Sequence, residues 1–350
     1  MSTEKPEQHK QRARTETTKK AKQSTDREYS VSQSMEDAVG ITVQNLSYLL
    51  RVEEVKGLGP QKFKSAFEAG LRPEDLLNNP KQLRIPGKRG EEIQRSLAQV
   101  ADKDSAALIT RAKRYIAQAY QYGAKIITYW HPLYPQIVFR SNYPTPILFA
   151  RGTTELLITN KTVACVGSRK IRPPYSERHQ EFAEVASRLG FTIVAGFALG
   201  ADSIGHQAAV KAGGNTICVM AGGLDRPFPP ENRSLWEDFL RSSGAVFVSE
   251  APFGARAGGL TLRKRNKLIV AFSLGVLISQ SREKGGTMNA YRFGLEQHKP
   301  IATFLDDGTE DSSGNKLISQ STKVLMATFD SKEPNRESWQ RWLQQLSYSI

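Results

Sequence analysis

The sequence predicts an α/β protein in which a parallel sheet wrapped by helices follows a small helical domain. Between residues 161 and 305, short strand-like runs alternate with helical patterns, which is typical of parallel strands joined by crossover helices. Those runs are continuously apolar, as expected for strands that are buried on both faces of a sheet. Residues 37–120 instead carry apolar residues at helical spacing, and a chain of 350 residues is long enough for both units.

Residues 1–36 are polar and carry the Lys/Arg-rich patches KQRAR and KKAKQ. Because they include almost no large apolar side chain, they cannot bury enough surface to offset the entropy of ordering. We expect a disordered basic tail that is mainly solvated, with a modest non-specific phosphate contact as the alternative.

Residues 37–120 are expected to form a bundle of short helices separated by two glycine-rich turns. The segment 55–63 fits the hxGhGxxx pattern of a helix-hairpin-helix, whose backbone N–H groups can hold a DNA phosphate. The segment 85–90 is a looser second copy. Since such hairpins also serve as packing modules, the pattern leaves direct DNA contact open.

Residues 121–330 are assigned to the sheet domain. Its first part, residues 121–160, is rich in proline and aromatic residues and is expected to be a lead-in with short extended runs. The strands are then expected at TVACVG, TIVAG, TICVM, AVFVSE, GVLISQ and PIATFL. Residues 306–330 are expected to be a loop with one more extended run. Residues 331–350 are expected to form a short amphipathic tail that carries Trp339, Trp342, Leu343 and Leu346 on one side.

The charge balance points to polyanionic partners. Lys and Arg number 49 against 35 Asp and Glu, a net charge of +14 with a pI near 9.7. This excess favours nucleic acid, nucleotides or an anionic membrane face, although a merely solvated basic surface would have the same composition. No run of 18 apolar residues is present, which argues against a membrane span.

The cysteines and the N-terminus indicate a reducing, cytoplasmic environment. Cys165 and Cys218 both lie in apolar runs, which excludes a disulfide scaffold and a cysteine-based zinc site. The first residues, MSTEKPEQHKQRAR, lack the apolar stretch of a secretory signal.

Two glycine-containing loops follow the first two expected strands of the alternating region. The carboxyl ends of parallel strands form the ligand-binding edge of such sheets, and glycines let backbone N–H groups approach an anion. The second loop is neither a Walker A nor a GxGxxG motif, so a dinucleotide site is not indicated. Asp202 is expected to cap the helix after the second loop, and the pattern favours a satisfied, partly buried His206 over a catalytic one. The candidate anion-binding residues here are Gly167, Ser168, Arg169, Lys170, Gly196, Phe197, Ala198 and Gly200.

Three further segments reach the same edge. The proline-rich loop 222–232 follows the third strand, and its structural and functional interpretations are equally favoured. Cations clustered at the start of the next helix oppose the helix dipole, which favours an anion there. A glycine pair then precedes a helix after the strand GVLISQ. The candidate residues of the last two segments are Arg263, Lys264, Arg265, Asn266, Lys267, Gly285, Gly286 and Thr287.

Motifs for catalysis are absent. The sequence contains no HExxH, CxxC or GxSxG motif, and its acids near the sheet edge are single: Asp202, Asp225, Glu250 and Glu296. We therefore expect neither an enzyme nor a resident metal or cofactor.

The ordered motif series resembles the DNA-processing protein A family (DprA, also called Smf). The resemblance runs through YPQIVFRSNYPTPILFARG, VACVGSRK, AGFALGADSIGHQAAV, CVMAGGLDRPFPPENRSLW, GAVFVSEAPFG, RNKLIVAFS and GGTMNAYRFGLEQHKPIATF. With SSGNKLISQSTKVL it covers about residues 45–330.

The resemblance implies an extended Rossmann-like domain behind a helix-hairpin-helix or sterile-alpha-motif domain. It also implies a homodimer that binds single-stranded DNA and loads the RecA recombinase during natural transformation. Carried over by position, the DNA pocket would include Gly167, Ser168, Arg169, Gly196, Ala198, Gly200, Arg265, Asn266 and Lys267.

Several positions depart from the family pattern. Leu262 and Arg263 stand where members usually carry an aromatic residue and a proline, and Lys267 replaces an arginine. Loss of a stacking ring, worth about 1–3 kcal/mol per base, predicts weaker single-strand preference and steeper salt dependence. The usual acid after the fifth strand is replaced within SQSREKGG, and a short tail stands in place of the winged helix that many members carry.

We therefore expect a cytoplasmic single-stranded-DNA-binding protein of DNA uptake or recombination that contacts the phosphate backbone. A second hypothesis is a nucleotide sensor or hydrolase of the lysine-decarboxylase-like Rossmann group, based on Gly285-Gly286-Thr287 with Glu296 as candidate acid. A third is an interaction scaffold that uses the tail around Trp339 and Trp342.

Overall fold

The computed structural model describes residues 33–101, 105–322 and 326–348. Most of the expected basic tail, residues 1–32, lies outside these ranges. Residues 33–39 are helical, so the described part of the segment assigned to the tail, residues 33–36, belongs to a helix. The Val39 side chain in this helical segment is fully buried in the core, which holds the segment against the protein.

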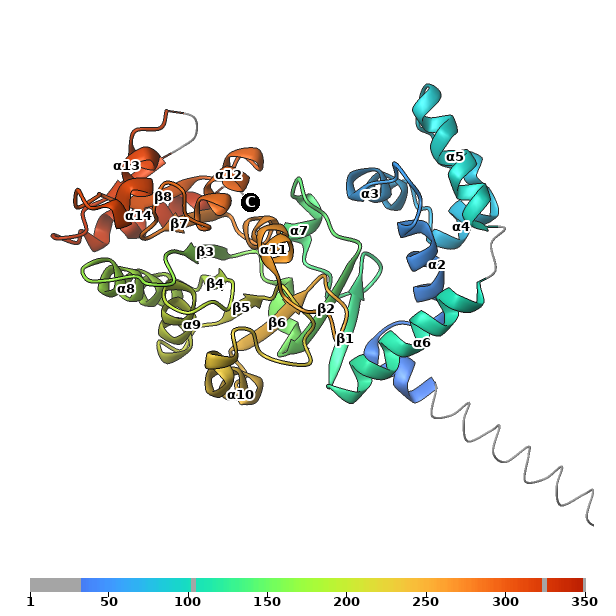
Figure 1. Ribbon diagram of the computed structural model, residues 1–350, viewed down its shortest axis with the longest axis horizontal. Coiled ribbons are helices and arrows are strands. Elements are labelled where there is room, and N and C mark those ends of the chain that lie inside the picture. Colours follow the sequence, from blue (N-terminus) through green and yellow to red (C-terminus); the bar gives the residue numbers. More distant parts are fainter. Residues whose placement is uncertain (1–32, 102–104, 323–325, 349–350) are drawn as a thin grey trace, which may run out of the picture.

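The predicted α/β fold class is confirmed by a nine-stranded sheet with the order β1-β2-β6-β5-β4-β3-β7-β8-β9 (Figure 1). All neighbouring strands from β6 to β9 are parallel, whereas β2 is antiparallel to both β1 and β6. The strands are β1 (Ala124–Thr128), β2 (Ile147–Gly152), β3 (Thr162–Val166), β4 (Thr192–Ala195), β5 (Thr216–Val219), β6 (Ala245–Ser249), β7 (Gly275–Ile278), β8 (Ile301–Phe304) and β9 (Met326–Phe329).

Strands β1 and β2 refine the prediction for residues 121–160. The lead-in contains two antiparallel strands that extend the sheet at one edge, with Ile126 paired to Phe149. Proline-rich sequence surrounds both strands, which hides their periodicity.

Helices cover both faces of the sheet because the parallel strands are buried on both sides. Val163 and Cys165 of β3 belong to the core cluster under α8, α9 and α14, while Ala164 and Val166 belong to the core cluster on the opposite face. Both cysteines are buried and unpaired. The helices of this part are α7 (Gln136–Arg140), α8 (Tyr175–Arg188), α9 (Ala201–Lys211), α10 (Arg233–Arg241), α11 (Gly259–Ala271), α12 (Met288–Glu296), α13 (Ser313–Ser319) and α14 (Arg336–Ser347).

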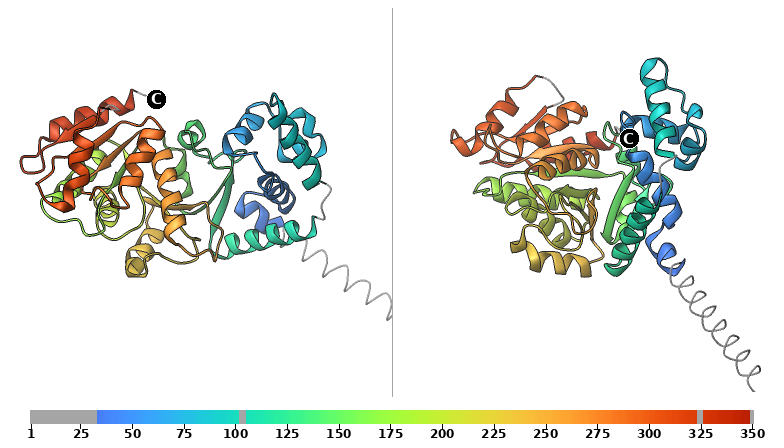
Figure 2. Two further views of the ribbon diagram at one scale, coloured as in Figure 1. Left: turned by 45° about the horizontal axis from the view of Figure 1, so that its top comes forward. Right: turned by 45° about the vertical axis from the view of Figure 1, so that its right-hand side comes forward.

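The helices before β1 lie beside the β1 edge of the sheet, and α13 and α14 lie toward its other end (Figures 1 and 2). An aromatic cluster joins the two parts, in which Phe63 and Phe67 contact the rings of Tyr129 and Trp130 at centroid distances of 5.3–5.9 Å. The helices are α2 (Val43–Glu53), α3 (Pro60–Glu68), α4 (Pro73–Asn78), α5 (Lys88–Ala101) and α6 (Ala106–Gln121).

Both predicted hairpins connect helical elements. Gly57 has a φ of +88° in the turn between α2 and α3, a conformation that side-chain-bearing residues rarely adopt. Gly87 has a φ of +76° in the second turn, and Gly90 lies in the first turn of α5, where a Cβ atom would lie 1.9 Å from the carbonyl oxygen of Ile85. The first hairpin packs against the segments that follow β1 and α7, because buried Phe63 contacts the Tyr129 ring and the Gln61 amide donates to the Ser141 carbonyl oxygen at 3.4 Å.

The region after β8 differs from the expected loop, because residues 313–319 form α13. Buried Asn315 anchors this helix: its side chain accepts from the Ser281 N–H at 2.9 Å and donates to the carbonyl oxygens of Ser279 and Phe304. Hydrogen bonds to distant backbone, together with the buried Ile318 side chain, therefore hold α13 in place.

The amphipathic tail is helix α14, and its apolar side is covered by the protein itself. Trp339 is fully buried and contacts the rings of Phe182, Phe304 and Phe329. The scaffold hypothesis assumed that this side was free for a partner, and the packing removes that basis.

Candidate nucleic-acid interface

The predicted convergence of loops at the carboxyl edge of the sheet is present as a cavity of about 470 Å³, called here the edge cavity. The loops after β3, β4 and β7 meet the first turns of α11 there, because these strands are parallel and end on the same side. The lining residues named in the sequence prediction are Gly167, Ser168, Arg169, Ala198, Arg263, Arg265, Asn266, Gly285, Gly286 and Thr287.

Hydrogen bonds join the loops of the edge cavity to one another. The Thr287 hydroxyl donates to the Gly167 carbonyl oxygen at 3.0 Å, which joins the β7 loop to the β3 loop. The Ala201 N–H donates to the Ser168 carbonyl oxygen at 3.1 Å, which joins the start of α9 to the same loop. These contacts hold the backbone in one arrangement before any ligand arrives.

Two arginines supply free positive charge. Arg169 and Arg263 are exposed, and neither makes a side-chain hydrogen bond or an ion pair within the described part of the chain. Arg282 also lines the cavity, but its guanidinium pairs with Asp311 at 2.5 Å and Glu310 at 3.5 Å. The available charge therefore comes from the β3 loop and from α11.

A buried layer beneath the edge cavity contains Arg265 and Asp202. Arg265 is 9% exposed and donates from Nη1 to the Val219 carbonyl oxygen at 2.7 Å. Burial lowers the pKa of Arg265 and raises that of Asp202, and their mutual attraction opposes both shifts. Gly196 leaves the space for this arrangement, since a Cβ atom there would lie 1.9 Å from Arg265 Nη1.

Histidine 206 supports the same layer, as the sequence favoured. It is fully buried, with Nε2 2.6 Å from the Gly196 carbonyl oxygen and Nδ1 2.5 Å from the Thr216 hydroxyl. Since a carbonyl oxygen only accepts, the ring donates from Nε2 to Gly196, while the Thr216 hydroxyl donates to the Ile193 carbonyl oxygen. The prediction that Asp202 caps α9 is wrong. Gly200 occupies the N-cap position, and Asp202, in the first turn of the helix, accepts a hydrogen bond from the Ala198 N–H at 3.3 Å.

The structure does not bring every predicted residue to the edge cavity. Residues of α11 that line it recur at helical spacing, so Lys264 and Lys267 fall on other sides of the helix. Lys264 pairs with Glu250 at 3.8 Å, and Lys267 lies over the rings of Tyr143 and Phe293. Lys170 is exposed on the β3 loop and does not line the edge cavity. Gly196 and Gly200 do not line it either, but they leave space for Arg265 and for the backbone of the β3 loop.

A second, smaller cavity of about 170 Å³ adjoins the first and shares Arg169, Ala198, Leu262 and Arg265 with it. The proline-rich loop contributes Phe228, Pro229 and Glu231, which gives this loop a place at the site. Phe197 also lines it, yet its ring is 1% exposed and packs against Trp236 and Phe247.

The edge cavity is also lined by Gly259 and Ile269, which the sequence analysis did not name. Helical spacing from Leu262 and Asn266 could have predicted both.

The acids considered for catalysis do not gather at the site. Glu250 is paired with Lys264, and the Asp225 carboxylate accepts from the Gly254 N–H at 2.8 Å and contacts Arg226. Glu296 does not line either cavity. Among the described lining residues of the edge cavity, Asp202 is the only carboxylate, and it is buried.

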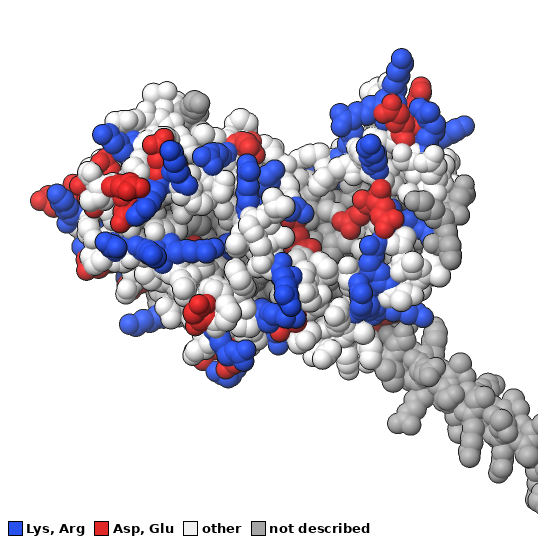
Figure 3. Space-filling model, in the orientation of Figure 1, with Lys and Arg blue, Asp and Glu red and all other residues white. Residues whose placement is uncertain are grey.

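The face drawn in Figure 3 carries both charge signs, with Asp and Glu side chains above and below a basic row. Lys and Arg side chains form a row across the sheet part of the molecule, in the region of β3 and α8 (Figure 3).

In the described residues, no helix combines the length and the apolarity that a membrane crossing requires.

Comparison with known proteins identifies relatives of the chain. The sequence pattern of the family described as DNA recombination-mediator protein A matches residues 125–333. The DNA processing protein DprA of Bacillus subtilis is 30% identical over 189 residues, which are 53% of this chain and 63% of that protein. Protein Smf of Escherichia coli is 29% identical over 211 residues, which are 60% of this chain and 55% of that protein. The chain thus spans about half to two thirds of the length of these curated relatives.

Two solved structures share the fold. DprA from Streptococcus pneumoniae matches with a TM-score of 0.58 at 20% identity, over 80% of this chain and 95% of that chain. DNA processing protein A from Helicobacter pylori, studied for its single-stranded DNA binding mode, matches with a TM-score of 0.53 at 23% identity, over 65% and 97%. The resemblance that the motifs predicted is confirmed, and because the family pattern covers more than half of its residues, the chain belongs to the DNA recombination-mediator protein A family.

Proposed function

We propose that this protein binds single-stranded DNA in the edge cavity and acts in DNA uptake or recombination. The proposal depends on two guanidinium groups without an ion-pair partner among the described residues, those of Arg169 and Arg263. Both lie at a cavity that glycine-containing loops line. The one carboxylate among the described residues that line the edge cavity is buried beside Arg265, so a polyanion meets net positive charge there. The single-stranded DNA binding mode studied in the Helicobacter pylori relative agrees with this proposal.

The proposed contacts are mainly to phosphates. Guanidinium groups bind phosphate oxygens through two parallel hydrogen bonds, and such contacts carry no base sequence. The smaller cavity adds the exposed surfaces of Leu199 and Phe228, on which a sugar or base can pack. Because the buried Phe197 ring cannot stack on a base, we expect low sequence preference and a steep dependence on salt.

The proposal extends to partners and domains. We propose a binding role without catalysis, in which a homodimer delivers single-stranded DNA to a RecA-type recombinase. We further propose residues 37–120 and 121–330 as its two domains. Light scattering would report the dimer, and a strand-exchange assay on DNA coated with a single-strand-binding protein would report delivery.

Replacing Arg169 or Arg263 by Ala is expected to weaken binding of a labelled oligothymidine at least tenfold at low salt. Each change removes one phosphate contact, so the slope of log affinity against log salt should fall by about one. Fluorescence anisotropy over a salt series with single-stranded and duplex oligonucleotides measures both quantities.

The matched control is Arg341→Ala, because Arg341 is exposed on α14 and lies outside both cavities. This change should leave the affinity and the salt slope unaltered. Parental affinity in the Arg169 and Arg263 variants would refute the proposed site. Saturable binding or hydrolysis of nucleoside monophosphates, without oligonucleotide binding, would favour the nucleotide-enzyme alternative.

A further inference from the structure

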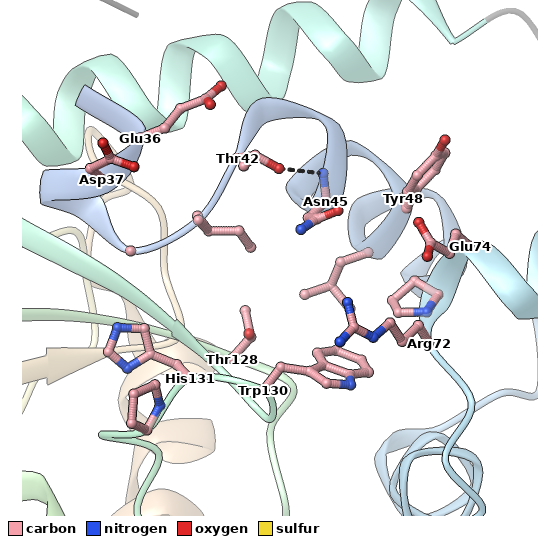
Figure 4. A pocket seen from close by; sticks show the side chains of 15 residues that line it. Glu36, Asp37, Thr42, Asn45, Tyr48, Arg72, Glu74, Thr128, Trp130 and His131 are labelled. Atoms are coloured by element: carbon pink, nitrogen blue, oxygen red, sulfur yellow. Dashed lines mark hydrogen bonds between the residues drawn. The ribbon is translucent and has the colours of Figure 1, made fainter. Parts of the chain in front are cut away.

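A separate cavity of about 500 Å³ lies between the helical part and the end of β1 (Figure 4). We call it the acidic cavity. Its walls are the helical segment 33–39 with the turn that follows, one side of α2 with the start of α4, and the loop after β1. Its volume falls within the range of small-ligand pockets. Most of its lining precedes residues 125–333, so the family match does not account for it.

The charge of the acidic cavity is opposite to that of the chain. Glu36, Asp37 and Glu74 line it against a single guanidinium, that of Arg72. Burial and the neighbouring charge of Lys125 lower the pKa of His131, so this ring adds no positive charge at neutral pH. A cavity with this balance attracts cations, in a chain whose net charge is +14.

The acidic groups are held in place. Glu36 accepts from the Val43 N–H at 2.9 Å, and Asp37 accepts from the Gln33 side chain at 3.1 Å. Within the described residues, the Glu74 carboxylate has no hydrogen-bond or ion-pair partner, and it lies beside Tyr48 on the opposite side of the space (Figure 4). The carboxylates therefore flank the cavity from two sides.

An unsatisfied hydroxyl points into the same space. Thr128 is 5% exposed, its hydroxyl has no hydrogen-bond partner among the described residues, and its side chain projects from β1 into the cavity (Figure 4). The hydroxyl oxygen itself reaches the open space of the cavity, where a ligand or water completes its hydrogen bonding. The Trp130 ring beside it is fixed by edge contacts with Phe63 and Phe67 at 5.9 and 5.3 Å.

We propose that the acidic cavity binds an alkylammonium or guanidinium group that carries a short apolar stem. The carboxylates neutralise the cation, and the rings of Trp130 and Tyr48 attract it by cation–π interactions. The Thr128 hydroxyl oxygen accepts a hydrogen bond from one of its N–H groups. Ile41 and Leu49 line the space for the stem. A free diamine offers this chemistry, and so do the Lys and Arg side chains of residues 1–32, which join the chain next to Gln33.

The test is a titration of the full chain with 1,5-diaminopentane, followed by calorimetry and tryptophan fluorescence. Trp130 is the partly exposed one of the four tryptophans, since Trp236, Trp339 and Trp342 are buried. We expect saturable binding with a change in fluorescence. Glu74→Gln and Asp37→Asn should each weaken it at least fivefold. Glu337→Gln, an exposed position on α14, should not alter it.

A second arm separates the two sources of the cation. In a full-length variant with Lys19, Lys20 and Lys22 replaced by Gln, tighter diamine binding than in the parent assigns the cavity to the tail. Equal binding assigns it to a free amine. The proposal is overturned if neither protein binds diamine saturably, if 1-pentanol binds equally well, or if folded Glu74→Gln and Asp37→Asn proteins bind like the parent.

Discussion

Acidification from pH 7 to pH 4.5 is expected to lower the free energy of unfolding by several kcal/mol through two buried histidines. His179 and His206 are fully buried, and burial lowers the pKa of each from 6.5 to about 4. Between these values the unfolded chain binds protons that the folded protein does not bind, so stability falls as the pH falls. The stabilisation is complete above pH 6.5 and is lost progressively down to about pH 4, by about 3 kcal/mol per histidine.

Denaturant unfolding at pH 7, 5.5 and 4.5 measures this loss. His206→Gln keeps a donor for the Gly196 carbonyl oxygen and removes the titrating ring, so its stability should depend less on pH than that of the parent. The control is His298→Asn, because His298 is exposed and its φ of +53° suits asparagine. Identical pH profiles for the parent and His206→Gln would show that the buried ring does not cause the acid sensitivity.

Gly200→Ala is expected to destabilise the protein by at least about 3 kcal/mol and to weaken DNA binding at least tenfold. Gly200 has a φ of +78°, and a Cβ atom there would lie 2.5 Å from the Ser168 carbonyl oxygen and 2.6 Å from that of Arg169. Backbone atoms form this contact, so no side-chain rotation relieves it. The β3 loop must move, and the guanidinium of Arg169 moves with it.

Gly213→Ala provides a matched comparison. Gly213 has a φ of +77°, yet a Cβ atom there would meet nothing within 4 Å. This change should cost only the backbone strain, about 1–2 kcal/mol, and should leave DNA affinity intact. Denaturant unfolding and anisotropy on both variants separate the strain from the steric contact. Equal losses in the two proteins would mean that Gly200 is needed only for its φ.

Much of the site could be predicted from local sequence because loops after parallel strands share one edge. The glycines and Arg169 follow strands that are recognisable as apolar runs, so their convergence follows from the fold class alone. The direction of each side chain on α11 is different, because it depends on which side of the helix faces the sheet. Arg263 reaches the cavity, whereas Lys264 turns to Glu250 and Lys267 to two aromatic rings.

The helix α13 and the acidic cavity show where local sequence is insufficient. α13 depends on Asn315, whose partners lie 11–36 residues away in the chain. The acidic cavity combines Asp37 and Glu74 with Thr128, which no periodic pattern connects. Such groups become neighbours only when the helices pack against the β1 edge.

The sequence by itself determined the fold class, the family and the order of the loops along the sheet edge, because apolar periodicity and glycine positions are local properties of the chain. Only the tertiary structure decided which cations remain unpaired, which side chains lie in the buried layer under Gly196, and that α14 is covered internally. The reason is that charge pairing and burial depend on atoms that are distant in the sequence, and the packing of the sheet, α11 and the N-terminal helices brings those atoms together.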